Sequence, residues 1–254
     1  MNFEYIIALA LLLLAYGAVL WLMKYFKNRA LTNLIFTLFV FIPYLFNAAI
    51  VYESVGFYDW NFQNVLPVAN VSPFMFCLVP LMLIVPRRAQ RYLYLLVSLL
   101  SVGMLLSSVF GCIYNASINY RFHFNFLLDY IAHMALSLFG VYLVRSGQVK
   151  LSLRNALVSG SVIISVATLM LLLNVVFDTS FFGLSLNGKH SIYNSVLVDN
   201  SYLSALLYYI GLSAVLIMGY GYSYLWSHDR FKIGALAMDS HECHISSNDP
   251  TRAR

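Results

Sequence analysis

The chain has 254 residues, of which 61% are hydrophobic and only 10% are charged, and its formal net charge is +5. A soluble domain carries about 45–50% apolar and about 25% charged residues, so this chain cannot cover a water-facing surface and lipid must be its solvent. The positive charge does not indicate nucleic acid as a partner, because the basic residues stand in short gaps between apolar runs and not along one face.

The apolar runs are long enough to cross a membrane. A spanning helix needs about 20 mostly apolar residues, since each adds about 1.5 Å across a hydrocarbon core of about 30 Å. The runs are continuous and not alternating, so barrel strands are excluded. We therefore predict an all-α bundle of about seven transmembrane helices, in the windows Tyr5–Met23, Leu31–Val51, Leu66–Val85, Tyr92–Ile113, Phe124–Val144, Ala156–Phe177 and Tyr202–Trp226.

The two ends of the chain differ in character. The first window has no basic segment before it, and Lys24 and Lys27 follow it, so we expect a retained helix and not a cleaved signal. After the last window the sequence turns polar and ends in SSNDPTRAR. We predict one transmembrane domain over residues 1–226 and a cytoplasmic, disordered tail over residues 227–254.

Lysine and arginine predict the orientation. Of the 15 basic residues, 13 fall in the first, third and fifth gaps or in the tail, and only Arg121 and Lys189 fall on the other side. Because cytoplasmic loops carry the excess of Lys and Arg, the N-terminus is predicted to lie outside and the C-terminus in the cytoplasm. We expect a multi-pass protein of the cell membrane with membrane lipids as its partners.

Ionisable residues at membrane depth gather in the fifth window, which reads RFHFNFLLDYIAHMAL. Asn125, Asp129 and His133 are spaced by four and therefore share one helix face, with His123 toward the outside. An aspartate four residues before a histidine can hydrogen-bond the ring and fix its tautomer for use as a base. The pattern suits a proton-handling or catalytic pocket, and it equally suits a polar packing network. Three ligands on one helix do not make a zinc site, so we expect no metal and no cofactor.

The third window contains Pro67, Pro73 and Pro80, each of which removes a backbone donor from a helix. Such breaks occur in membranes where the backbone faces protein or a cavity. Asn70 and Ser72 beside them could cap the freed groups or line a pocket, and kinked packing alone is the alternative.

The sixth window ends in LLLNVVFDTSFFG, where Asn174 and Asp178 are again four residues apart. Asn174 lies deeper and needs a partner. If it faced the fifth helix, it would complete a polar site with Asp129 and His133. Asn47, after Pro43 on the second window, is a weaker candidate.

The order of these motifs resembles the YwaF-like family of bacterial integral membrane proteins. A Leu66-Pro67 opening, the stretch FHFNFLLDYIAHM and the turn NVVFDTSFF carry the resemblance, over roughly residues 30–226. The eukaryotic relatives of that family include an acyltransferase acting on ether phospholipids. The resemblance matches His133, His123 and Asn174 to family positions.

One family feature is missing. A histidine and then a cysteine usually follow the Leu-Pro pair, whereas this chain has Val68-Ala69-Asn70-Val71, with Cys77 six residues further on. A cysteine acyl-enzyme needs a thiolate beside a base. The resemblance therefore implies either a variant that uses His133 directly as the base or a member that has lost the activity.

Taken together, these observations predict an outward-facing polar pocket between the third, fifth and sixth helices. The leading hypothesis is acyl transfer on lipid, with His133 as base, Asp129 orienting it and Asn174 polarising a carbonyl. The alternatives are a carrier or receptor for a small polar ligand, proton-coupled through Asp129 and His133, and a scaffold without catalysis. The candidate binding residues are His123, Asn125, Asn70, Ser72 and Asp178.

Overall fold

The computed structural model describes residues 2–55, 70–119, 121–177, 184 and 201–228. Every regular element among them is helical, and no strand occurs within these ranges. The long elements are α1 (Phe3–Leu22), α2 (Arg29–Val55), α5 (Arg87–Ile118), α6 (Phe124–Arg145), α7 (Leu153–Phe177) and α9 (Ser201–His228). Two shorter ones complete the order, the 3-10 helix η1 (Met23–Tyr25) and α4 (Val71–Leu81).

Six of these helices are long and apolar enough to cross a membrane, which confirms the predicted polytopic helix bundle. The third window differs from the prediction. Its described helix, α4, has only 11 residues and ends at Leu81 instead of continuing to Val85. At about 1.5 Å per residue, α4 spans about half of the hydrocarbon core.

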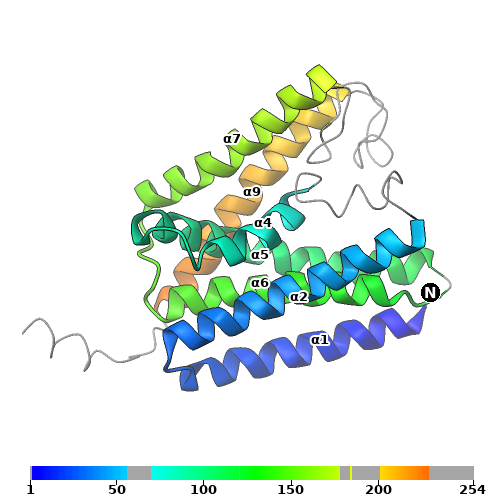
Figure 1. Cartoon of the computed structure of the whole chain (residues 1–254), viewed down its shortest axis with the longest axis horizontal. Coiled ribbons are helices and arrows are strands. Elements are labelled where there is room, and N and C mark those ends of the chain that lie inside the picture. The colour runs from blue at the N-terminus through cyan, green and yellow to red at the C-terminus, as the bar shows by residue number, and fades with distance from the viewer. Residues whose placement is uncertain (1, 56–69, 120, 178–183, 185–200, 229–254) are drawn as a thin grey trace, which may run out of the picture.

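Local hydrogen bonding explains where α4 ends. Pro80 has no N–H to donate within the last turn. The chain then tightens, with Leu83 donating to the Pro80 carbonyl and Ile84 to the Leu81 carbonyl, both at 3.1 Å. These are three-residue steps in place of the four-residue steps of an α-helix. Because α2 ends at one end of the bundle and α5 begins at the other, the segment that contains α4 crosses back between them (Figure 1).

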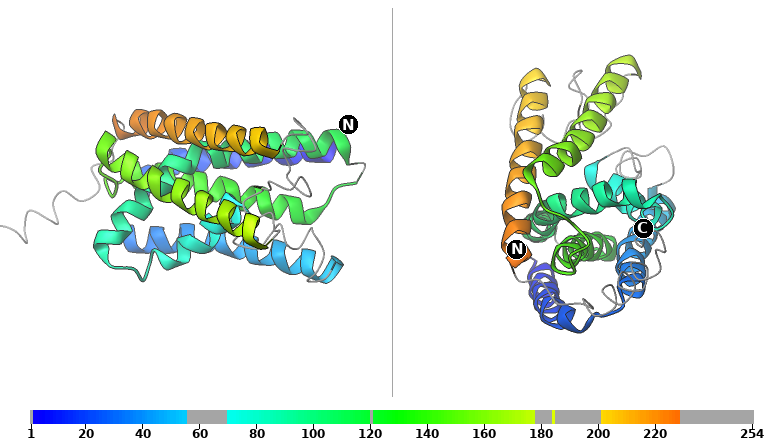
Figure 2. Two further views of the ribbon diagram at one scale, coloured as in Figure 1. Left: turned by 90° about the horizontal axis from the view of Figure 1, so that it is seen from above. Right: turned by 90° about the vertical axis from the view of Figure 1, so that its left-hand side faces the viewer.

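The helices differ in how much of their surface they bury. α6 lies in the middle of the bundle and α5 packs along it, with α1 and α2 on one side and α7 and α9 extending on the other (Figure 2). In the most apolar window of α6, 83% of the residues are buried, against 11% in the corresponding window of α1 and 28% in that of α7. A helix that carries polar groups at membrane depth is expected inside the protein, whereas wholly apolar helices can face lipid.

Small residues let α5 approach both of its neighbours closely. A Cβ at Gly140 of α6 would lie 2.9 Å from the Val97 carbonyl oxygen, and a Cβ at Gly219 of α9 would overlap the Leu99 carbonyl. Ser98 joins the same region, because its hydroxyl donates to the Gly140 carbonyl at 3.1 Å. Close backbone approach through glycine and serine is how membrane helices pack without a hydrophobic driving force.

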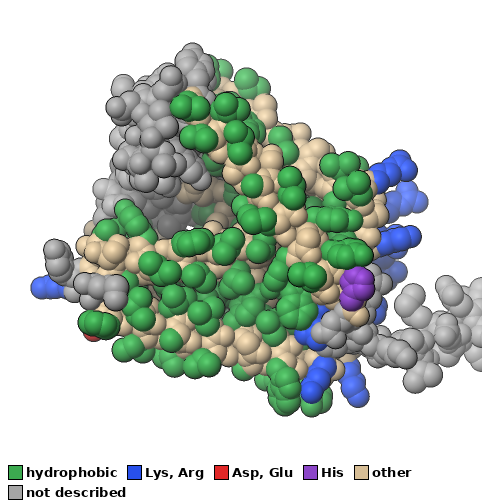
Figure 3. All heavy atoms as spheres, turned by 180° about the vertical axis from the view of Figure 1, so that it is seen from behind, with side chains coloured by type: hydrophobic (Ala, Val, Ile, Leu, Met, Phe, Trp, Pro, Cys, Tyr) green, Lys and Arg blue, Asp and Glu red, His purple; other side chains and the backbone are tan. Residues whose placement is uncertain are grey.

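Basic side chains mark one end of the bundle, which we call the basic end. Figure 3 shows Lys and Arg gathered there, with hydrophobic side chains covering the flank of the molecule. Arg121 lies at the opposite end, because α5 begins at the basic end and Arg121 follows the last residue of that helix, Ile118. This distribution agrees with the orientation expected from the sequence, which remains a prediction until the protein is placed in a membrane. The described residues of the basic end are Lys24, Lys27, Arg29, Arg87, Arg88, Arg91, Arg145, Lys150 and Arg154.

Candidate functional site

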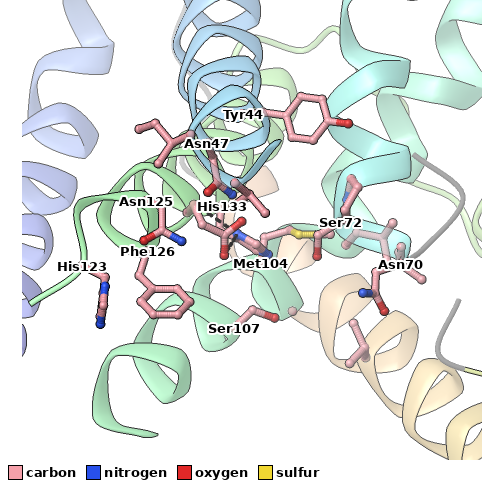
Figure 4. Close-up of a pocket in the computed structure, with 18 of the residues that line it drawn as sticks. Tyr44, Asn47, Asn70, Ser72, Met104, Ser107, His123, Asn125, Phe126 and His133 are labelled. Atoms are coloured by element: carbon pink, nitrogen blue, oxygen red, sulfur yellow. Dashed lines mark hydrogen bonds and ion pairs between the residues drawn. The ribbon is translucent and has the colours of Figure 1, made fainter. Parts of the chain in front are cut away.

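A cavity of about 1090 Å³ lies between α2, α4, α5, α6 and α9, in the half of the bundle away from the basic end. Its wall is mixed. Leu100, Met104, Leu212 and Val215 contribute apolar surface, whereas asparagine, serine and histidine side chains contribute polar groups. Figure 4 shows these polar residues around the cavity, with His123 and Asn125 at one side, Asn70 and Ser72 at the other, and His133 between them.

His133 is the buried histidine of this cavity. It sits on α6 and is 7% exposed. Its Nδ1 atom lies 2.8 Å from the backbone carbonyl oxygen of Asp129, one helical turn earlier, and 3.5 Å from the Asp129 carboxylate oxygen Oδ2. A carbonyl oxygen can only accept, so Nδ1 carries the proton and, in the neutral ring, Nε2 has the free lone pair.

This geometry corrects one detail of the sequence-based expectation. The backbone carbonyl of Asp129, rather than its carboxylate, makes the shorter contact that fixes the tautomer of His133. The reason is that the four-residue spacing places the carbonyl of residue 129 directly below the ring. The carboxylate is 34% exposed and lines the cavity instead.

Aromatic rings hold the imidazole in place. Phe76 of α4 is fully buried and meets the His133 ring edge-on, with centroids 4.9 Å apart and planes at 89°. Tyr44 of α2 packs against Phe76 in turn, at 5.6 Å. The ring of His133 is therefore positioned by α4 and α2 as well as by its own helix.

Cys77 lies next to Phe76 but belongs to a different environment. Its thiol shares a side-chain hydrogen bond with the Tyr44 hydroxyl, and Cys77 is not among the residues lining the cavity. The thiol thus does not stand where a nucleophile beside His133 would be needed.

The structure brings most of the predicted site residues to one place. Asp129, His133 and four of the predicted binding residues all line the cavity. The backbone N–H of His123 also donates to the Tyr5 hydroxyl at 3.1 Å, which ties the start of α6 to α1. The four binding residues are Asn70, Ser72, His123 and Asn125.

Two predicted residues lie elsewhere. Asn174 is 2% exposed and its amide donates to the Leu184 carbonyl, and it does not line the cavity. Its helix, α7, packs on α5 and α9, so the structure does not bring Asn174 to His133. Asp178 lies outside the described residues.

Asn47 was only a weaker candidate from the sequence, but it lines the cavity. It lies on α2, one turn after Pro43, and is 6% exposed. Of the buried polar side chains in the described ranges, only Asn47 and His133 line the cavity. The Oδ1 atom of Asn47 has no hydrogen-bond partner among the described residues. The one sequence feature that pointed to it is a polar residue at membrane depth.

Over the described part of the chain, no group of three or more His, Cys, Asp or Glu side chains lies close enough to hold a metal ion.

The sequence profile of the TMEM164 family matches residues 1–224. The chain belongs to the TMEM164 family. The TMEM164 match takes in α1 and nearly all of α9, so every wall of the cavity lies inside it. No curated protein and no solved structure matches the chain significantly.

Proposed function

We propose that this TMEM164-family protein transfers an acyl group between membrane lipids, with His133 as the general base. The observation that carries the proposal is the fixed tautomer of His133. Nδ1 is held by the Asp129 carbonyl, and Nε2 has no hydrogen-bond partner among the described residues, on a ring that lines the cavity. A base with this arrangement can take a proton from a ligand in the cavity.

The cavity suits an amphiphilic ligand. Its volume of about 1090 Å³ lies just above the range of about 300–1,000 Å³ that is usual for ligand pockets. Met104 and Leu100 can contact an acyl chain, while Asn70 and Ser72 can bind a polar group. A lipid combines both kinds of surface, whereas a small polar solute would leave the apolar wall unused.

The proposed step needs no cysteine. The hydroxyl oxygen of an acceptor lipid attacks the ester carbonyl of a donor lipid, and the hydroxyl proton passes to Nε2 of His133. The new ester C–O bond forms, the old one breaks, and the proton returns to the departing alkoxide oxygen. The Asp129 carboxylate, 3.5 Å from Nδ1, stabilises the imidazolium while it carries the second proton.

The resemblance to YwaF-like proteins supports this choice of reaction. The position of the basic end supports an orientation with the cavity toward the outside, because the basic end would then face the cytoplasm. The cell membrane is the location that belongs to this proposal.

The experiment compares the wild type with His133→Ala after reconstitution in vesicles that contain a lysophospholipid and a phospholipid with a labelled acyl chain. We expect labelled product from the wild type and a loss of about 10²–10⁴-fold in the variant, the usual contribution of a general base. His228→Ala is the matched control, because His228 is exposed at the far end of α9. Equal product from wild type and His133→Ala would sink the proposal.

Other outcomes point to the alternatives. Binding or uptake of a small solute without a labelled product would favour a carrier or receptor that uses the Asp129–His133 pair. If Asp129→Asn and His133→Gln change only the stability of the protein, a scaffold is favoured. Comparing the lipid profiles of cells with and without the gene provides the same separation in vivo.

A further inference from the structure

Asn47 stands out because a buried amide oxygen without a partner is rare in proteins. Most buried polar atoms are hydrogen-bonded, and one that is not calls for an explanation such as a missing ligand. The side chain is 6% exposed, and its Oδ1 atom has no partner among the described residues. Asn47 lines the same cavity as His133, and Figure 4 draws both among the residues around it.

The surroundings of Asn47 show that the position is not polar for packing reasons alone. It follows Tyr44, whose ring belongs to the aromatic row that positions His133. On the same helix Thr37 also buries an oxygen without a partner among the described residues, but Thr37 does not line the cavity. Asn47, unlike Thr37, therefore has access to whatever the cavity holds.

The reaction proposed above creates a need for a donor at this place. Attack on an ester carbonyl builds negative charge on the carbonyl oxygen, which preorganised N–H groups stabilise. The Asp129 carboxylate in the cavity cannot help, because it only accepts when ionised. The atom that lacks a partner among the described residues, Oδ1, is itself an acceptor. The two ends of the amide have nearly the same shape, so turning it exchanges Oδ1 and Nδ2 and puts the N–H donors at the unpartnered position.

We propose that Asn47 donates a hydrogen bond from Nδ2 to the carbonyl oxygen of the acyl group bound in the cavity. The proposal rests on the proposed function and assigns to Asn47 the polarising role that the sequence suggested for Asn174. The acyl chain then lies toward Leu100 and Met104, and its carbonyl carbon lies between Asn47 and the acceptor hydroxyl held by His133.

The test uses two lipids that differ only in this carbonyl. The first is 1-palmitoyl-lysophosphatidylcholine, and the second is 1-O-hexadecyl-lysophosphatidylcholine, in which a methylene group replaces the carbonyl. Binding of each to the full chain in maltoside micelles is followed through thermal stabilisation as a function of lipid mole fraction. The wild type is expected to bind the acyl form about five to ten times more tightly, the value of one neutral hydrogen bond.

Asn47→Leu removes the donor and keeps the branched shape of the side chain, so the ratio should fall to about one. Thr37→Val is the matched control, because it removes the other unpartnered buried oxygen of α2 and should leave the ratio unchanged. An unchanged ratio in Asn47→Leu, or an equal loss in Thr37→Val, overturns the proposal.

A second measurement does not depend on the folding of a variant. With a ¹³C-labelled ester carbonyl, the infrared stretch of the bound lipid should move to lower wavenumber in the wild type, and the absence of any shift overturns the proposal.

The binding measurement also separates this inference from the proposed reaction. If the wild type binds the acyl lipid more tightly but forms no labelled product, the carbonyl contact stands and the acyl transfer is rejected. If labelled product forms but the two lipids bind equally, the acyl transfer stands and the carbonyl contact is rejected.

Discussion

The Nδ1 atom of His133 lies 2.8 Å from the carbonyl oxygen of Asp129, while the carboxylate of the same residue is 3.5 Å away. One residue thus makes two separable contributions to the ring, one through its backbone and one through its side chain. The backbone contact survives any substitution at position 129 that leaves α6 helical. This separation makes the role of the carboxylate measurable.

Asp129→Asn should therefore lower acyl transfer less than His133→Ala does. The tautomer stays correct because the carbonyl remains, and only the charge that stabilises the imidazolium is lost. We expect a loss of about tenfold, against about 10²–10⁴-fold for removal of the base. The vesicle assay with a labelled acyl chain measures both variants, and a larger loss in Asp129→Asn than in His133→Ala would contradict this division of roles.

Gly219→Ala should destabilise the bundle. A Cβ at residue 219 would overlap the carbonyl of Leu99, so α9 would have to move away from α5. Overpacking of this kind costs about 1–3 kcal/mol, which thermal unfolding in micelles detects. Gly221→Ala is the control, because nothing lies within 4 Å of a Cβ there. Similar melting temperatures for the two variants would show that the two helices do not touch at this point.

The hydroxyl of Tyr16 should contribute to the docking of α1. It lies 2.9 Å from the Ser137 hydroxyl of α6 and 3.1 Å from the Tyr222 hydroxyl of α9. Hydrogen bonds between membrane helices contribute about 0.6 kcal/mol on average and up to about 1.7 kcal/mol. A double-mutant cycle of Tyr16→Phe and Ser137→Ala should give a coupling energy in this range, and strictly additive effects would rule the bond out as a stabilising contact.

The orientation can be tested with single cysteines in a cysteine-free background. Arg121 lies at the end opposite the basic end, and Arg154 lies at the start of α7 within the basic end. A membrane-impermeant maleimide should label Arg121→Cys in intact cells and label Arg154→Cys only after permeabilisation. The reversed pattern would place the cavity toward the cytoplasm.

The membrane helices, the shared face of the α6 polar residues and the position of the basic residues each depend on short stretches of sequence, so the sequence alone predicts them. Continuous apolar runs produce membrane helices wherever they occur, because an unpaired backbone group is too costly in lipid. The spacing of Asn125, Asp129 and His133 put them on one face, since that periodicity belongs to a single helix. The basic residues stand in alternate gaps between the apolar runs, so the crossing helices bring them to one end of the bundle.

The contacts between helices were decided only by the tertiary structure. Asn47 and Asn174 look alike in the sequence, as lone amides at membrane depth, yet α2 turns the first into the cavity while α7 directs the second to the Leu184 carbonyl. Local propensity sets neither the rotation of a helix nor its neighbours. Those follow from close packing at small residues such as Gly140 and Gly219, which decide how near each helix can come and which of its faces is covered.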